Sequence, residues 1–252
     1  MRMCCLAWCS LLCLGCHLPN AEENLSIGEQ PNQSNATDSR TITLAAVEDA
    51  RPAPDENQDC LGLAAACVEK GDHAGAAFQM KRHLQRHPEQ IMIRAYLAEI
   101  LLKLKRLPDA QYHFEQFIAE AQDADGPSAK HVLHCHTRLM EIAQERDDIY
   151  GEHLHRGIGM VLLARRLDKG LGGEIEAGFR ERLLCKAAAE LSQARRARPD
   201  EPRPNLYLYE TWTKLNQTHS AEKALKTARS LAVFWPMSPS EQRLLVLTLG
   251  VR

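Results

Sequence analysis

Similar residues recur 34 positions apart in two separate stretches of this chain of 252 residues. The recurring residues are small or aliphatic, with one aromatic exception. The pairs are Leu63 and Leu97, Ala64 and Ala98, Ala76 and Ala110, Met80 and Phe114, Ala187 and Ala221, Leu191 and Leu225, and Ala194 and Ala228. A fixed period of this length is typical of units that bury their apolar faces only by stacking on their neighbours. The recurrence therefore predicts a repetitive array over residues 57–252.

Apolar residues in the same part of the chain keep helical spacing, and strand-like alternation is absent. Glycine and proline turn signals separate segments that are long enough to be helices. These signals fall at residues 70–72, 87–88, 107–109, 126–128, 170–173 and 199–204. Each repeating unit should therefore be a helical hairpin, and the fold class should be all-α.

The recurring positions resemble the tetratricopeptide repeat, a helix–turn–helix unit with small residues at its helix crossing. The first unit carries the pattern as Leu63-Ala64, Gly71-Asp72, Ala76, Met80 and Pro88. The resemblance implies a helical-hairpin solenoid, a tetratricopeptide-like α-α superhelix, with its clearest repeats at 57–90, 91–124 and 202–235. A non-repetitive helical bundle is the alternative.

The middle of the array, residues 128–198, follows no clean period. Three long helices are expected there, over 129–146, 149–168 and 174–198. Either the repeat units are extended in this region or an additional helix interrupts the array, and the spacing is compatible with both.

The first residues of the chain form an apolar segment with a short positive start. Residues 4–15 carry no charge, and they are too few to span a bilayer, which takes about 20 residues in a helix. They fit the apolar region of a signal peptide, residues 1–15. Cys13-Leu14-Gly15-Cys16 resembles the lipobox of bacterial lipoproteins, which implies acylation of Cys16 and stable anchoring by two or more lipid chains. An ordinary cleaved signal peptide with release of a soluble protein is the alternative.

Residues 16–56 are polar and carry a net charge of −6, whereas residues 57–252 carry +3. Low hydrophobicity and self-repelling charge predict a disordered acidic tether. The whole chain has a formal net charge of −2, so its charge does not indicate a nucleic-acid partner.

The two resemblances together imply a scaffold on the bacterial membrane, lipid-anchored on the extracytoplasmic, periplasmic side. The scaffold would bind a protein or peptide in a groove lined by the first helix of each unit. The family's groove positions fall on Met92, Glu99 and Lys103 in the second unit and on Arg203, Glu210 and Lys214 in the last. Neither catalysis nor a cofactor is expected, since the nucleophile-elbow, P-loop, zinc-protease and dinucleotide motifs are absent.

A second hypothesis is an extracytoplasmic haem- or metal-binding protein. Cys13, Cys16 and His17 satisfy the C-x-x-C-H pattern of haem attachment. A further set of nitrogen and sulfur ligands, the His131–His155 cluster, would suit zinc if it converged. Its members are His131, His134, Cys135, His136, His153 and His155. A third hypothesis is a structural envelope component without a single partner.

Two charged stretches are interpreted as helix-terminal features. Asp147-Asp148 precedes a predicted helix, and Arg195-Arg196-Ala197-Arg198 ends another, so each charge complements a helix dipole. A phosphate or anionic-lipid contact at the arginines is the alternative. Residues 239–249 are expected to form a capping helix, with Val246, Leu247 and Leu249 covering the end of the array.

Overall fold

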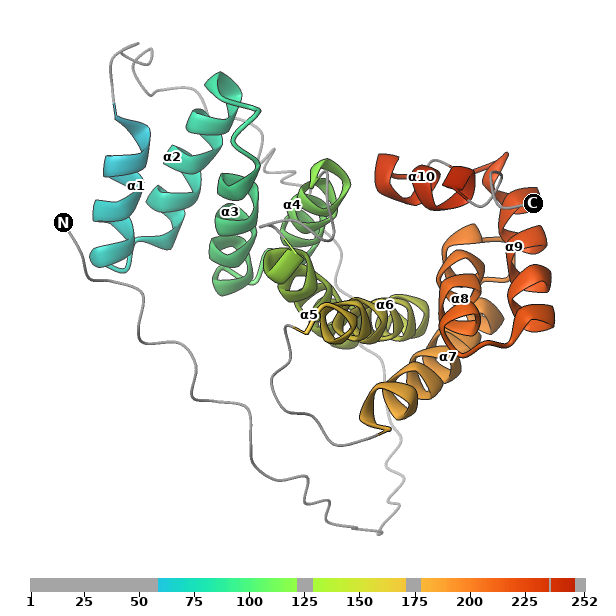
Figure 1. The fold of residues 1–252 in the computed structure, drawn as a ribbon. Helices are drawn as coiled ribbons and strands as arrows, with labels where there is room; N and C mark the ends of the chain where they lie inside the picture. Colours follow the sequence, from blue (N-terminus) through green and yellow to red (C-terminus); the bar gives the residue numbers. More distant parts are fainter. Residues whose placement is uncertain (1–58, 122–128, 171–177, 236, 248–252) are drawn as a thin grey trace, which may run out of the picture. The chain divides into compact units, whose positions relative to one another are not determined.

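The computed structural model describes residues 59–121, 129–170, 178–235 and 237–247, all within the second of two compact units, Pro54–Arg252 (Figure 1). These residues form helices and no strand. The helices are α1 (Cys60–Glu69), α2 (His73–Arg86), α3 (Ile91–Lys103), α4 (Leu107–Glu120), α5 (Ala129–Glu145), α6 (Ile149–Asp168), α7 (Phe179–Ala197), α8 (Pro202–Lys214), α9 (Thr218–Ala232) and α10 (Pro239–Leu247). The predicted all-α helical-hairpin fold is confirmed. The signal peptide, Cys16, His17 and the acidic tether lie outside the described residues.

Four hairpins share one kind of tight turn. In each, one residue between the two helices has a positive φ, which closes the first helix by the left-handed C-terminal motif. These residues are Gly71 (75°), Lys105 (57°), Asp147 (53°) and Asn216 (57°). The amide of the next residue donates to a carbonyl in the preceding helix: Asp72 to Cys67 at 2.8 Å, Arg106 to Leu101 at 2.9 Å, Asp148 to Ala143 at 2.9 Å, and Gln217 to Trp212 at 2.8 Å. The turns therefore define the hairpins α1–α2, α3–α4, α5–α6 and α8–α9.

Helix α7 belongs to none of these four hairpins, yet it joins α8 as α2 joins α3. Both α2 and α7 end at a non-helical residue that precedes a proline, His87 (φ −130°) and Arg198 (φ −136°). Helix α7 packs along α6 on one side and against α8 on the other. Helix α6 is thus the second helix of one hairpin and the first helix of the next. Both alternatives left open by the sequence therefore contribute to the broken period: α7 is an additional helix, and α5, α6 and α7, with 17, 20 and 19 residues, are longer than the helices of the other three hairpins.

The packing of α7 on α6 depends on Gly157. A Cβ atom at this position would lie 2.7 Å from the Leu191 Cγ and 2.9 Å from its Cδ2. Leu191 is fully buried and cannot move aside without disturbing the apolar cluster around it. The absence of a side chain at Gly157 therefore sets how closely the two helices approach.

Most of the recurring positions are buried, as their repetition predicted. Alanines at the helix crossings exclude solvent almost completely; they are Ala64, Ala76, Ala98, Ala110, Ala187, Ala194, Ala221 and Ala228. Larger side chains fill the space between hairpins, among them the fully buried Leu97, Phe114 and Leu191. Leu63, Met80 and Leu225 are only half-buried. Small residues at crossings and large residues between units explain why the pattern repeats.

Helix α10 forms where a capping helix was expected, but it presents a different face. Leu244 and Leu245 pack against Leu206, Ala228 and Met237. Val246 is 60% exposed, so the expectation that it covers the end of the array is wrong. Leu249 lies outside the described residues. None of the described helices combines the length and apolarity needed to span a membrane.

Adding a methyl group at Gly157 should destabilise the fold. Gly157→Ala is expected to lower the free energy of unfolding by about 1–2 kcal/mol, because overpacking costs about 1–3 kcal/mol and the better helix propensity of alanine offsets only part of that cost. Urea denaturation followed by circular dichroism measures the change.

Gly159 on the same helix provides the matched control. A Cβ there would meet only the Leu133 Cδ1 at 3.7 Å, an ordinary contact distance. Gly159→Ala should therefore stabilise the protein by about 0.5–1 kcal/mol. Equal effects of the two substitutions would contradict the close packing of α6 and α7.

Candidate functional site

The six residues expected to line a groove fall into two sets, on α3 and on α8. Met92 is half-buried and packs against the main apolar core, whereas Lys103 is exposed at the end of α3. Glu99, between them, is engaged with α5. Of the three residues on α8, Glu210 and Lys214 pair with residues of α6. Arg203 pairs with Glu201, in the segment before α8. Helices α3 and α8 are not among the described helix pairs that pack extensively, so each set is held by its own neighbouring helices.

The α3 set centres on a carboxylate held by two groups from α5. The Glu99 Oε1 lies 2.7 Å from the His134 Nε2 and accepts a hydrogen bond from the Arg138 Nε at 3.0 Å. Burial alone would raise the pKa of Glu99, but the hydrogen bond with His134 and the charge of Arg138 outweigh it and hold the pKa below its usual value. Arg138 also donates to Glu141 at 2.8 Å. Glu99 is therefore ionised and tied to α5.

The α8 set makes the corresponding contacts with α6. Arg165 donates to both carboxylate oxygens of Glu210, at 2.6 and 2.5 Å, in the two-pronged geometry that favours arginine. Lys214 donates to Asp168 at 2.6 Å, and Asp168 also pairs with Arg180 at the start of α7. Glu210 and Lys214 are thus committed to pairs across helices, and a partner would have to compete for them.

Two buried histidines form a separate polar site between α5 and α6. The Nδ1 atoms of His136 and His155 lie 3.1 Å apart, so one ring donates a hydrogen bond and the other accepts it. Burial, followed by the positive charges of Arg203 and Arg165, lowers the pKa of His136 to about 3. Burial and then the neighbouring His136 also lower the pKa of His155. Both rings are therefore neutral at pH 7.

Three other members of the His131–His155 cluster have different surroundings. His134 lies against Glu99, and the His153 Nδ1 lies 2.7 Å from the Glu190 Oε2. Cys135 is fully buried, and burial followed by the charge of Glu99 raises the pKa of its thiol to about 12. No three such ligands converge on a metal position within the ranges that the structure describes. The described part of the chain thus offers no support for a metal site in this cluster.

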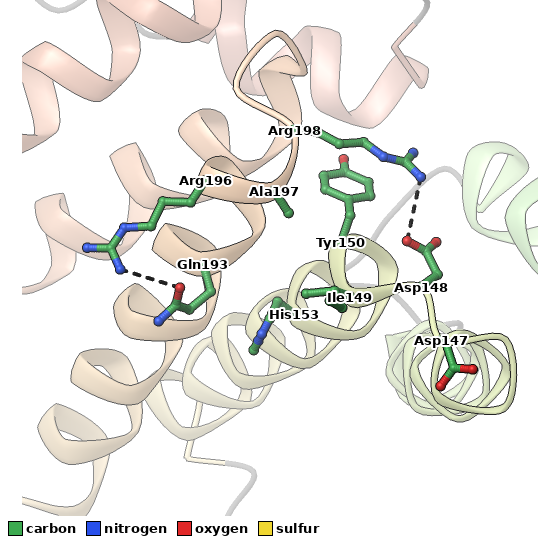
Figure 2. A pocket seen from close by; sticks show the side chains of 9 residues that line it. All are labelled: Asp147, Asp148, Ile149, Tyr150, His153, Gln193, Arg196, Ala197 and Arg198. Atoms are coloured by element: carbon green, nitrogen blue, oxygen red, sulfur yellow. Dashed lines mark hydrogen bonds and ion pairs between the residues drawn. The ribbon is translucent and has the colours of Figure 1, made fainter. Parts of the chain in front are cut away.

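A cleft of about 570 Å³ lies between the start of α6 and the end of α7, and we call it the α6–α7 cleft (Figure 2). It is lined by Asp147, Asp148, Ile149, Tyr150, His153, Gln193, Arg196, Ala197 and Arg198. Figure 2 shows the Arg198 side chain extending over the Tyr150 ring, with its guanidinium carbon 4.3 Å from the ring centroid. The same guanidinium lies 3.5 Å from the Asp148 Oδ1. Cation–π and ionic contacts therefore hold Arg198 over one side of the cleft.

The cleft combines the two charged stretches that the sequence marked as helix-terminal. Asp148 does cap α6, since its Oδ1 accepts a hydrogen bond from the Gly151 amide at 3.2 Å. Sequence reasoning missed that the Asp147-Asp148 turn and the arginines of α7 share one cleft. Their proximity follows from the packing of α7 on α6 at Gly157, and no local sequence pattern encodes it.

A smaller cavity of about 280 Å³ lies along the α5–α6 hairpin. Its lining is mostly apolar and includes Leu133, Met140, Met160 and Leu163, together with His155. The cavity gives His155 mostly apolar neighbours, in agreement with the lowering of its pKa by burial.

Comparison with known proteins gives structural neighbours only. No protein family and no curated protein matches this sequence. Among solved structures, the protein MamA aligns with 15% identity over 71% of this chain and 96% of its own, with a TM-score of 0.37. A thermophilic TPR protein of Thermus thermophilus aligns with 19% identity over 77% and 82% of the two chains, with a TM-score of 0.34. PilW, described as a type IV pilus biogenesis factor, aligns with 18% identity over 76% and 84%, also with a TM-score of 0.34.

The buried histidine pair should make the protein less stable in acid. His136 stays neutral in the folded state down to about pH 3, whereas an unfolded histidine takes up a proton below about pH 6.5. The contribution of the neutral His136 to the free energy of unfolding is therefore fully present above pH 6.5 and is lost as the pH falls toward 3. His136→Gln should make the free energy of unfolding depend less on pH, reducing its slope against pH by up to about 1.4 kcal/mol per pH unit. Urea unfolding between pH 7 and 5 measures it.

His219→Gln is the matched control, since His219 is exposed at the start of α9. It should leave the slope of the free energy of unfolding against pH unchanged. An unchanged slope for His136→Gln would show that this histidine is not kept neutral by burial.

Proposed function

We propose that this protein is an extracytoplasmic, lipid-anchored scaffold that binds a segment of a partner protein in the α6–α7 cleft without catalysing a reaction. The observation that carries the proposal is the cleft itself, in which aromatic, aliphatic and oppositely charged side chains from three segments surround one open volume of about 570 Å³. A volume in this range accommodates a few side chains of a bound segment.

The lining of the cleft has the chemistry of a protein-binding site. Tyrosine and arginine dominate binding energy at protein interfaces, and here Tyr150 and Arg198 are stacked on each other in advance. Ile149 at the rim is 65% exposed and offers apolar surface. The Tyr150 hydroxyl is buried and has no hydrogen-bond partner within the described residues. A bound segment with an apolar side chain for Ile149 and charges of both signs would complement the accessible groups.

The groove residues implied by the tetratricopeptide resemblance remain a second proposed contact region. Lys103 is exposed at the end of α3. Glu99, Glu210 and Lys214 would contact a partner only by giving up ion pairs with neighbouring helices. We therefore expect the α6–α7 cleft to provide most of the binding energy.

A photo-crosslinking amino acid at position 149 tests the site. In cells of the organism that encodes the protein, it should give a discrete adduct with one partner, and Arg198→Ala should weaken adduct formation about tenfold, as expected for loss of one important interface residue. Gel mobility and mass spectrometry measure the adduct.

Position 112 is the matched control, because Tyr112 is an exposed large side chain on α4 (54% exposed) and does not line the cleft. It should give no such adduct. The same adduct pattern from both positions, or an adduct insensitive to Arg198→Ala, would contradict binding in the cleft.

The membrane anchor rests on the first sixteen residues and has its own test. Intact-mass analysis of the native protein should show a chain that begins at Cys16 with a diacylglycerol on its sulfur and, in many lipoproteins, a third acyl chain on its amino group. An unmodified chain that begins elsewhere would indicate the secreted form. A chain that keeps Cys13 and carries the mass of haem would favour the haem hypothesis.

A further inference from the structure

Helix α10 contacts helices that lie far apart in the sequence. It packs on α8 and also touches α4, more than 100 residues earlier in the chain. Leu244 and Leu245 lie against Leu206 of α8 and Ala228 of α9. Val246, on another side of α10, is 60% exposed. The helix is therefore docked by one face.

The helix has its own local N-terminal cap. The Ser238 amide donates to the Glu241 Oε2 at 2.9 Å, and the Glu241 amide donates to the Ser238 Oγ at 3.3 Å, which together form a capping box. At nine residues, α10 is shorter than the roughly 12–15 residues that an isolated helix needs in water. Its helical state therefore depends on docking, and once undocked it should unfold.

The start of α8 contains buried polar groups that have no hydrogen-bond partner within the described residues. Glu201, at the start of α8, is 1% exposed; its Oε1 accepts from the Arg203 Nε at 2.6 Å, and its Oε2 has no hydrogen-bond partner within the described residues. Asn205 is also 1% exposed, and neither atom of its amide is hydrogen-bonded within those residues. Buried polar atoms without partners are costly.

Docking of α10 adds a second carboxylate to this region. Glu241 is 9% exposed and lies within electrostatic range of Glu201, Arg203 and Tyr207. Glu241 thus brings a second carboxylate within range of Arg203, which already pairs with Glu201 and which the sequence predicts to contact a partner. Burial and then, in part, the charge of Glu241 raise the pKa of Glu201. The apolar contacts of α10 and the attraction of Glu241 to Arg203 favour docking, whereas the repulsion between Glu241 and Glu201 opposes it.

We propose that α10 is a displaceable intramolecular ligand, and that the surface it covers on α8, α9 and α4 receives an amphipathic helix of a partner protein. That helix would carry two adjacent leucines for Leu206 and Ala228, and polar groups that hydrogen-bond with Asn205 and Glu201 in place of a second carboxylate. The proposal rests on the proposed scaffold function only for the partner. The docking equilibrium of α10 is a property of this chain alone.

The equilibrium can be tested with a labelled synthetic peptide of residues 237–247. A short tether gives an effective concentration of about 1 mM, so an α10 that is docked about nine-tenths of the time corresponds to a Kd of about 0.1 mM for the same peptide in trans. The full-length Leu244→Asp/Leu245→Asp variant, whose own α10 cannot dock, should bind the peptide with about this Kd. The wild type should bind it at least tenfold more weakly. Fluorescence anisotropy measures both values.

Full-length Val246→Asp is the matched control, because it places the same charge on the exposed side of α10. It should bind the peptide as weakly as the wild type. A peptide carrying the two leucine substitutions should bind none of the proteins, and circular dichroism should show that each variant keeps its other helices.

Three results would overturn the proposal. Equal peptide affinity of the wild type and the double variant would show that α10 does not occupy the surface. Failure of the double variant to bind the peptide would show that the surface does not accept a helix in trans. A concentration-dependent wild-type dimer, lost in the double variant, would place α10 on a second copy instead. None of these outcomes bears on crosslinking at position 149, so the two proposals fail independently.

Discussion

The close approach of α6 and α7 at Gly157 is the contact on which the functional surfaces of this protein depend. With Leu191 buried against a glycine, α7 can lie along α6 as a second helix would, although α6 already closes a hairpin with α5. One helix therefore serves two hairpins. As a consequence, an additional helix, α7, stands between the hairpin α5–α6 and the hairpin α8–α9. Side chains of α6 and α8 nevertheless contact each other.

Three features follow from that arrangement. The end of α7 comes beside the α5–α6 turn, which creates the α6–α7 cleft and stacks Arg198 on Tyr150. The position of α8 beside α6 allows Arg165 to donate hydrogen bonds to both carboxylate oxygens of Glu210. Burial is the main reason why the pKa of His136 is low, and the same arrangement brings Arg203 close enough to lower that pKa further. Charged groups on α6 and α8 thus act on one another because a glycine lets α7 fill the space between hairpins.

The polar groups inside this packing account for much of its specificity. Ion pairs such as Arg165–Glu210 are mostly buried, and removing one partner would leave an uncompensated charge. The histidine pair is tolerated because both rings stay neutral and hydrogen-bond to each other. Around Asn205 and Glu201, at the start of α8, the hydrogen bonding is incomplete within the described residues, and Glu241 of α10 lies within electrostatic range of Glu201. The contacts whose buried polar groups are fully hydrogen-bonded are thus the permanent ones. The contact of α10, which we propose to be exchangeable, involves the start of α8, where hydrogen bonding is incomplete.

The sequence by itself determined the all-α class, the hairpin repeat and the buried alanines at helix crossings, because these depend on periodicity and on side-chain volume within one unit. It also located the Asp148 cap, a local hydrogen bond between neighbours in the chain. Only the tertiary structure decided that α6 belongs to two hairpins, that the His131–His155 cluster divides among several surroundings, and that two helix-terminal charge stretches share a cleft. The tertiary structure also decided which face of α10 packs against α8, the face of Leu244 and Leu245, and left Val246 exposed. Each of these depends on how one helix packs against another, which a periodic sequence pattern does not encode. At the crossing of α6 and α7, the missing side chain of Gly157 sets the approach, and a single glycine does not alter the period of the sequence.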